Sequence, residues 1–163
     1  MNRPPTILIL RGLPAAGKTT WADTWRQANP NNREIINRDQ LRHHLFGQYS
    51  ALTQEQEDTV TTHELNLAET ALLNGKAIVI DDTNLEPEHL AVWTDLANRH
   101  HLTYQIITID TPLAECLERN RRRAANGGRL APEHIIHEMH RTAETSQTPA
   151  NPGLSPLPRT ITP

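Results

Sequence analysis

The sequence predicts an α/β fold in which a central parallel sheet of about four strands is flanked by helices. Two observations support this fold class. Four short apolar runs alternate with longer amphipathic runs along the 163 residues, which is the pattern of strand–helix–strand units with right-handed crossovers. The first apolar run leads through a glycine-containing segment into the first amphipathic run. A chain of this length most simply forms one domain with a substantial core.

The strands are expected where apolar residues follow one another without interruption. The run Thr6–Leu10 lacks polar alternation, which indicates a strand that is buried on both faces, as in a parallel sheet. The clearest second run is Ala77–Asp82, which ends in two aspartates. Runs at 34–37 and 103–109 complete the predicted sheet.

Helix signals separate these strands. Thr53 and Gln56 form a capping box that opens a long helix, and Gly75 ends it. Pro87 and Pro132 stand where prolines commonly begin helices. The expected helices are therefore about 18–28, 40–46, 53–75, 87–99, 113–123 and 132–145. Residues 1–145 form the predicted domain, and the Pro-rich residues 146–163 form an extended or poorly ordered tail.

The segment after the first strand has the spacing G-x-x-x-x-G-K-T, which is that of the phosphate-binding loop, or P-loop. Its glycines let the backbone curl so that N–H groups point at phosphate oxygens, and the following helix adds its positive N-terminal end. We expect Lys18 to reach the β- and γ-phosphates and the Thr19 hydroxyl to coordinate Mg²⁺. The residues expected to bind the nucleotide here are Gly12, Pro14, Ala15, Ala16, Gly17, Lys18, Thr19 and Thr20.

The alternative is an ordinary strand-to-helix turn that happens to carry a surface lysine. The composition argues against it, because the chain has fourteen Arg but only two Lys. A sequence that places Arg at nearly every cationic position still has Lys18 here, where a compact point charge suits a phosphate.

Composition also excludes some classes of protein. The formal net charge of −3 and the pI of about 6.3 give no overall basic field, so a polyanion would have to bind a local patch over a short footprint. The single cysteine excludes an intrachain disulfide and fits a reducing compartment. Neither a signal peptide nor a membrane span is recognisable. The sequence thus predicts a cytoplasmic protein that does not associate with membranes.

Polar residues follow the predicted strands, and the carboxyl ends of parallel strands form the edge where ligands bind. A carboxylate that closes an apolar strand completes an Mg²⁺–nucleotide site. Both Asp81 and Asp82 stand at such a place, and because alternate residues point to opposite faces, the pattern does not choose between them. Each could instead cap a turn or a helix.

The segment after the second strand carries Asp39 and Arg42, one helical turn apart. An ionised aspartate at this edge can orient an acceptor hydroxyl and accept its proton. An arginine on the same helix face can bind a phosphate through two hydrogen bonds. The alternatives are a helix N-cap for Asp39 and a solvated surface charge for Arg42.

An arginine cluster lies on the helix after the fourth strand, and the flexible joint Asn126–Gly128 follows it. The cluster comprises Arg119, Arg121, Arg122 and Arg123. Arginines on such a lid can stabilise a transferring phosphate and exclude water. A solvated basic helix face is the alternative.

Four segments, in this order, carry a resemblance to a known family: GLPAAGKTTWA, INRDQLR, IDDTNLEPE and TPLAECLERNRRR. They closely resemble the 5′-kinase module of bacteriophage-type polynucleotide kinases, which belong to the P-loop phosphotransferases. The resemblance covers about residues 6–145. It implies a P-loop kinase fold with a helical lid, and transfer of the γ-phosphate of ATP to the 5′-hydroxyl end of DNA or RNA with Mg²⁺.

The resemblance also implies roles for individual residues. Lys18 and Thr19 match the loop lysine and hydroxyl, Asp39 the general base, and Arg42 the arginine that binds the acceptor's phosphate. Asp82, directly before Thr83, matches the essential carboxylate of the family, so the resemblance favours Asp82 over Asp81. It implies that Asp82 binds the metal together with Thr19 and also contacts the substrate. Arg123 best matches the lid arginine that contacts the nucleotide, and Arg119 is a plausible helper.

The sequence departs from the family in one respect, because the D-x-D-G-T signature of the 3′-phosphatase domain is absent from these residues. We therefore expect a kinase without phosphatase, acting in nucleic-acid repair. Two alternatives use the same loop: a kinase of a small molecule such as a nucleoside, sugar or antibiotic, and a non-catalytic nucleotide-binding module. The motifs define neither an oligomeric state nor a preference between DNA and RNA.

Overall fold

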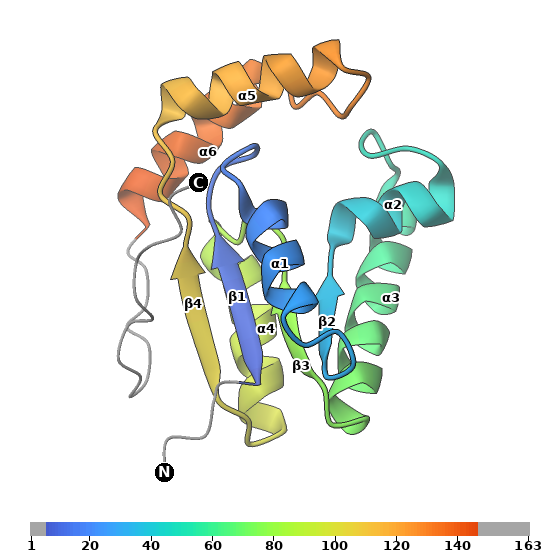
Figure 1. The fold of residues 1–163 in the computed structure, drawn as a ribbon. Helices are drawn as coiled ribbons and strands as arrows, with labels where there is room; N and C mark the ends of the chain where they lie inside the picture. The colour runs from blue at the N-terminus through green and yellow to red at the C-terminus, as the bar shows by residue number, and fades with distance from the viewer. Residues whose placement is uncertain (1–5, 147–163) are drawn as a thin grey trace.

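The computed structural model describes residues 6–146, so the predicted tail lies outside the described residues except for Ser146. The four strands are parallel and stand in the order β2-β3-β1-β4 (Figure 1). They are β1 (Ile7–Arg11), β2 (Arg33–Ile36), β3 (Ala77–Ile80) and β4 (Tyr104–Thr108). The predicted parallel sheet is therefore confirmed.

The described part of the chain contains six helices, all within a few residues of their predicted bounds. They are α1 (Lys18–Gln27), α2 (Arg38–Phe46), α3 (Gln54–Leu73), α4 (Pro87–Arg99), α5 (Leu113–Ala125) and α6 (Glu133–Thr145). Every helix within residues 6–146 is too short or too polar to span a membrane.

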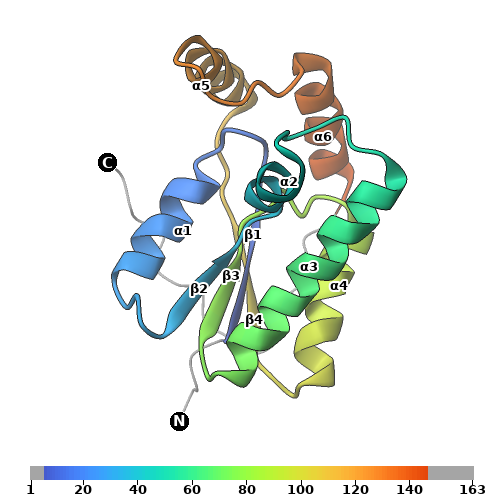
Figure 2. The ribbon, with the colours of Figure 1, turned by 90° about the vertical axis from the view of Figure 1, so that its right-hand side faces the viewer.

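The core forms two layers because alternate residues of a strand point to opposite faces. On one face, Ile7 and Ile9 of β1 pack with residues of α3 and α4. On the other face, Leu8 and Leu10 pack with Ala22 of α1. Figure 2 shows this arrangement, with α1 on one side of the sheet and α3 and α4 on the other. A strand buried on both faces accounts for the uninterrupted apolar run in the sequence.

Helix α2 begins at Arg38, two residues earlier than predicted. The cause is Asn37, whose side-chain oxygen accepts a hydrogen bond of 2.9 Å from the backbone N–H of Gln40. Asn37 is thus the N-cap of α2. The structure thereby removes the N-cap alternative for Asp39, which lies inside the first turn with its carboxylate available for other contacts.

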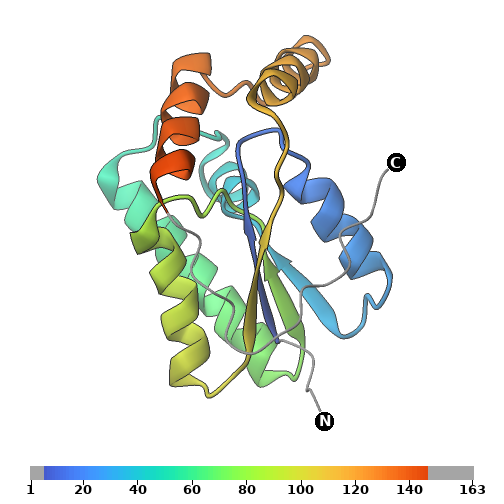
Figure 3. The same cartoon turned by 90° about the vertical axis from the view of Figure 1, so that its left-hand side faces the viewer.

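The pair α5 and α6 lies across the carboxyl ends of the strands (Figures 1 and 3). We call residues 126–132, which join the two helices, the lid turn. Asn120 is completely buried and holds this turn to α5. Its side-chain nitrogen donates to the carbonyl oxygen of Ala131 at 2.8 Å, and its oxygen accepts from the N–H of Ala131 at 3.0 Å.

We expect Asn120→Ala to lower the free energy of unfolding by about 2–3 kcal/mol, because it leaves the buried N–H and C=O of Ala131 without partners. Urea unfolding followed by circular dichroism measures this loss. Asn126→Ala is the matched control, since Asn126 lies exposed at the start of the same lid turn. Equal unfolding midpoints for the two variants would contradict the role of Asn120.

Candidate functional site

The P-loop joins β1 to α1 and curls tightly over the carboxyl edge of the sheet. Gly17 has a φ of 105°, in the left-handed region that favours glycine. Gly12 approaches the neighbouring chain so closely that an added Cβ would lie 2.8 Å from the carbonyl oxygen of Ile109. The two glycines of the motif therefore allow two different features, a backbone turn and a close approach to the end of β4.

Lys18 is a buried cation, with 8% of its surface exposed. Its Nζ donates hydrogen bonds to the carbonyl oxygens of Gly12 at 3.0 Å and Leu13 at 2.6 Å. Burial lowers the pKa of Lys18 to about 8, although the charges of Asp81 and Asp82 raise it. The ammonium is thus held under the loop by carbonyl oxygens, and a phosphate bound in the loop would supply the missing counter-charge.

Asp81 connects the P-loop to the start of α2. Its Oδ2 accepts a hydrogen bond of 2.8 Å from the Thr19 hydroxyl and another of 2.7 Å from the Asn37 side-chain amide. Burial raises the pKa of Asp81, and these two hydrogen bonds act in the opposite direction. A hydroxyl and a carboxylate are hard oxygen donors of the kind that Mg²⁺ prefers, so this pair fits such an ion.

Asp82, which the resemblance pairs with Thr19 at the metal, lies differently. Its Oδ1 accepts a hydrogen bond of 2.7 Å from the N–H of Thr83, within its own turn. Consecutive residues at a strand end point in opposite directions, and the N–H of Asp81 extends the ladder by bonding the carbonyl of Ile36. The geometry therefore brings Asp81, rather than Asp82, to the Thr19 hydroxyl.

Asp39 belongs to the first turn of α2, and its side chain contacts the lid turn. Its Oδ1 accepts a hydrogen bond of 3.0 Å from Nη1 of Arg42, as their shared helix face predicts. Its Oδ2 forms an ion pair with Nη1 of Arg129 from the lid turn. The Asp39 carboxylate is thus bound by two arginines, one from the helix that carries it and one from the lid turn.

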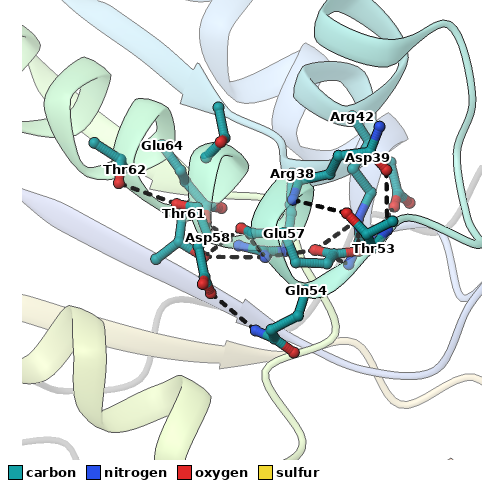
Figure 4. A network of polar contacts seen from close by, with 12 residues as sticks. Arg38, Asp39, Arg42, Thr53, Gln54, Glu57, Asp58, Thr61, Thr62 and Glu64 are labelled. Atoms are coloured by element: carbon teal, nitrogen blue, oxygen red, sulfur yellow. Dashed lines mark hydrogen bonds and ion pairs between the residues drawn. The ribbon is translucent and has the colours of Figure 1, made fainter.

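Glu57 of α3 holds two arginines of α2 (Figure 4). Its carboxylate accepts from Nε of Arg42 at 3.0 Å and from Nη2 of Arg42 at 3.1 Å. It also accepts from Nη2 of Arg38 at 2.7 Å. Burial raises the pKa of Glu57, but the hydrogen bonds from Arg42 and Arg38 outweigh burial, so the pKa lies below its usual value. The Arg42 guanidinium is therefore fixed along one edge.

Glu64 is the second carboxylate of α3 in this network, and it is 4% exposed. Its Oε2 pairs with Nη1 of Arg38 at 2.9 Å, while Oε1 has no hydrogen-bond partner among the described residues. Burial, followed by the charge of Asp82, raises the pKa of Glu64 to about 7. Arg38 therefore lies between one ionised carboxylate, Glu57, and one that takes up a proton near neutral pH.

The four predicted lid arginines lie in three different environments. Arg119 reaches the P-loop, where its Nη1 donates to the carbonyl oxygen of Ala16 at 3.2 Å. Arg123 instead turns to the lid turn, where its Nε donates to the carbonyl oxygen of Arg129 at 2.7 Å. The other two form exposed ion pairs, Arg121 with Glu133 and Arg122 with Glu118. Arg119, expected only as a helper, is thus the arginine that contacts the loop.

Sequence reasoning placed Arg129 in the lid segment but gave it no role of its own, and it gave Glu57 no role; both contact the predicted site residues. Arg129 follows two glycines at the predicted joint, and this position is the one signal that could have marked it. Glu57 lies in the first turn of α3 beside the capping box, where an acidic residue is common for reasons of helix stability alone. Nothing local distinguishes it from its neighbour Glu55.

Residues 7–145 match the model of the AAA domain family AAA_33, and the chain belongs to this family. It is 28% identical over 130 residues to "Putative bifunctional polynucleotide kinase/RNA ligase" of Autographa californica nuclear polyhedrosis virus, covering 72% of this chain and 18% of that protein. It is 26% identical over 144 residues to the L-seryl-tRNA(Sec) kinase of Methanococcus maripaludis, covering 87% and 54%. The chain therefore spans about half or less of these curated relatives.

Solved structures share the fold. A chain of the Pnkp1/Rnl/Hen1 RNA repair complex has a TM-score of 0.75 at 24% identity, over 88% of this chain and 45% of that one. The Mycobacterium tuberculosis APS kinase CysC, in complex with AMPPNP and APS, has a TM-score of 0.59 at 15% identity, over 85% and 97%. The P-loop kinase fold is thus confirmed, as is the resemblance to polynucleotide kinase modules.

The pKa of Lys18 leads to a prediction about pH. Lys18 is protonated below about pH 8 and loses its proton above it, and a phosphate favours the protonated form. We therefore expect nucleotide affinity to fall by about tenfold per pH unit above pH 8. Titration calorimetry measures the affinity, and NMR of ¹³C-labelled lysine follows the proton.

Lys76→Arg provides the assignment for this experiment, because it leaves Lys18 as the one remaining lysine. Lys76 pairs with Glu34 of β2. It directly precedes β3, at the end of the sheet opposite to the P-loop. A Lys18 signal that titrates near 10.5, the ordinary value for lysine, together with an affinity that does not change above pH 8, would contradict the lowered pKa of Lys18.

Proposed function

We propose that this chain is an ATP- and Mg²⁺-dependent polynucleotide 5′-hydroxyl kinase, which transfers the γ-phosphate of ATP to the 5′-hydroxyl end of DNA or RNA in end repair. The observation that supports this most is the placement of Asp39. The hydrogen bonds from Thr19 to Asp81 and from Asn37 to Asp81 tie the P-loop to the first residue before α2. Asp39 follows two residues later, inside the first turn of that helix.

In the proposed reaction, the P-loop amides and Lys18 hold the phosphates of ATP, and Thr19 and Asp81 would hold Mg²⁺. The metal would neutralise charge on the β- and γ-phosphates. Asp39 orients the 5′-hydroxyl and accepts its proton while the hydroxyl oxygen bonds to the γ-phosphorus. The bond between that phosphorus and the β–γ bridging oxygen breaks, and ADP leaves. Arg119 adds positive charge beside the loop.

Arg42 is proposed to bind the phosphate on the 3′ side of the acceptor nucleotide. A guanidinium has five N–H donors, of which Glu57 takes the Nε donor and one at Nη2, and Asp39 one at Nη1. One donor at Nη1 and one at Nη2 remain for a phosphate beside the Asp39 carboxylate. We also propose that Asp82 contacts the substrate. Arg123 of α5 positions the lid turn through its hydrogen bond to the carbonyl oxygen of Arg129.

The direct test incubates the chain with labelled ATP, Mg²⁺ and 5′-hydroxyl DNA and RNA oligonucleotides. We expect label on the oligonucleotide, and we expect Asp39→Asn to lower kcat by about 10²–10⁴-fold because the variant lacks the proton acceptor. The KM for ATP should change little, since the residues proposed to bind ATP are untouched. Asp95→Asn, at an exposed position of α4, is the control. Wild-type turnover by Asp39→Asn would refute the role of Asp39.

A kinase of small molecules is the second candidate, because the chain also shares its fold with APS kinase. Arg42 separates the two. We expect the wild-type chain to prefer a nucleoside 3′-phosphate over the nucleoside by about 10–100-fold in kcat/KM, the range of a charge-assisted hydrogen bond. Arg42→Gln should remove this preference and leave the KM for ATP unchanged.

Arg121→Gln is the matched control for Arg42→Gln, since its guanidinium forms an exposed ion pair on the outer side of α5. Steady-state kinetics with the two acceptors give the ratio for each variant. Equal use of nucleoside and nucleoside 3′-phosphate by the wild-type chain would favour the small-molecule candidate.

A further inference from the structure

We propose that His43 and Tyr49 form a stacking platform for a nucleobase at the end of the acceptor strand. This inference rests on the proposed function, and it adds a recognition element that the P-loop, Asp39 and Arg42 do not supply. The platform would bind the base through its aromatic face, so it would accept different bases.

The two rings form an exposed stacked pair. Their centroids are 4.6 Å apart and their planes are inclined by 18°. Tyr49 is 38% exposed, and His43 is exposed as well. Large aromatic side chains usually lie in a core or at an interface, whereas this pair lies outside the three buried clusters of the described residues.

The position of the pair relates it to the acceptor site. His43 follows Asp39 by four residues on α2, so the two side chains share a helix face about 6 Å apart along the axis. The ion pair between Asp39 and Arg129 shows that this face is turned to the lid turn. Tyr49 lies in the connection from α2 to α3, which Figure 1 places on the same edge of the molecule as the lid turn.

The spacing fits the end of a nucleic-acid strand. Stacked nucleotides rise by about 3.4 Å each, so about 6 Å from Asp39 is less than two nucleotides. A strand whose 5′-hydroxyl meets Asp39 would thus bring its terminal or penultimate base over His43 and Tyr49. Both side chains are of the kinds on which unpaired bases stack in proteins that bind single strands.

The charge of the chain favours stacking as a source of affinity. The formal net charge is −3, and three donors of Arg42 are already engaged by Asp39 and Glu57. A long groove that binds through phosphates alone needs many free cations. Base stacking is a contact between aromatic rings, so it requires no positive field, and it is open to every base because every base has an aromatic face.

The experiment measures the acceptor KM of Tyr49→Ala, Tyr49→Leu, Tyr49→Phe and His43→Ala with whichever oligonucleotide the wild-type chain phosphorylates. We expect Tyr49→Ala and Tyr49→Leu to raise the acceptor KM by about 5–100-fold, the range for loss of one stacked base. Tyr49→Phe should remain close to wild type, because it keeps the ring. The KM for ATP should not change in any of these variants.

A second measurement leaves the protein intact. Acceptors that lack the terminal or the penultimate base should raise the KM of the wild-type chain, while Tyr49→Leu should be insensitive to at least one of these deletions. A role limited to holding the connection from α2 to α3 would not produce this dependence on the base. Leu73→Ala is the control, since Leu73 is exposed at the far end of α3.

The outcomes separate this inference from the proposed function. A wild-type chain that labels no oligonucleotide overturns the proposed function. A wild-type chain that labels oligonucleotides, but whose acceptor KM is unaffected by abasic ends and by Tyr49→Leu, overturns the platform alone.

Discussion

The arrangement of the site depends on one buried carboxylate, that of Asp81 at the end of β3. A buried carboxylate is costly unless its oxygens accept hydrogen bonds. The two donors that satisfy Asp81, the Thr19 hydroxyl and the Asn37 amide, belong to the P-loop end of α1 and to the N-cap of α2. The same contacts therefore stabilise the carboxylate and set α2 beside the loop, which is the condition for Asp39 to face a bound nucleotide.

Around α2, positive and negative side chains pair with one another without a bound substrate. Three arginines, from α2 and the lid turn, meet three carboxylates, from α2 and α3; they are Arg38, Arg42 and Arg129 with Asp39, Glu57 and Glu64. Arg38 and Arg42 are each fixed between two carboxylates, and Arg129 is paired with Asp39. These pairs limit the freedom of the arginines before a substrate arrives, so less order has to be imposed at binding. The lid participates in this network through a single arginine, and the site is thus a joint product of α2, α3 and the α5–α6 connection.

Much of the fold could be predicted from local patterns. Ile7–Arg11 is buried throughout, and an uninterrupted apolar run indicates such a strand without knowledge of its neighbours. The capping box at Thr53 and Gln56 is present as predicted, because both of its hydrogen bonds lie within one helical turn. The start of α2 was missed by two residues, since Asn37 and Asp39 are both suitable N-cap residues and the sequence pattern favours neither.

The sequence alone determined the order of strands and helices, the P-loop between Gly12 and Thr19, and the helix face shared by Asp39 and Arg42, because each depends on residues within a few positions of one another. The tertiary structure alone decided that Asp81 bonds Thr19, that Arg119 contacts the loop, and that Glu57 holds Arg42. These contacts join elements that are distant in the chain. They depend on the angle at which one element packs on another, and that angle is a property of the assembled core rather than of any local run of residues.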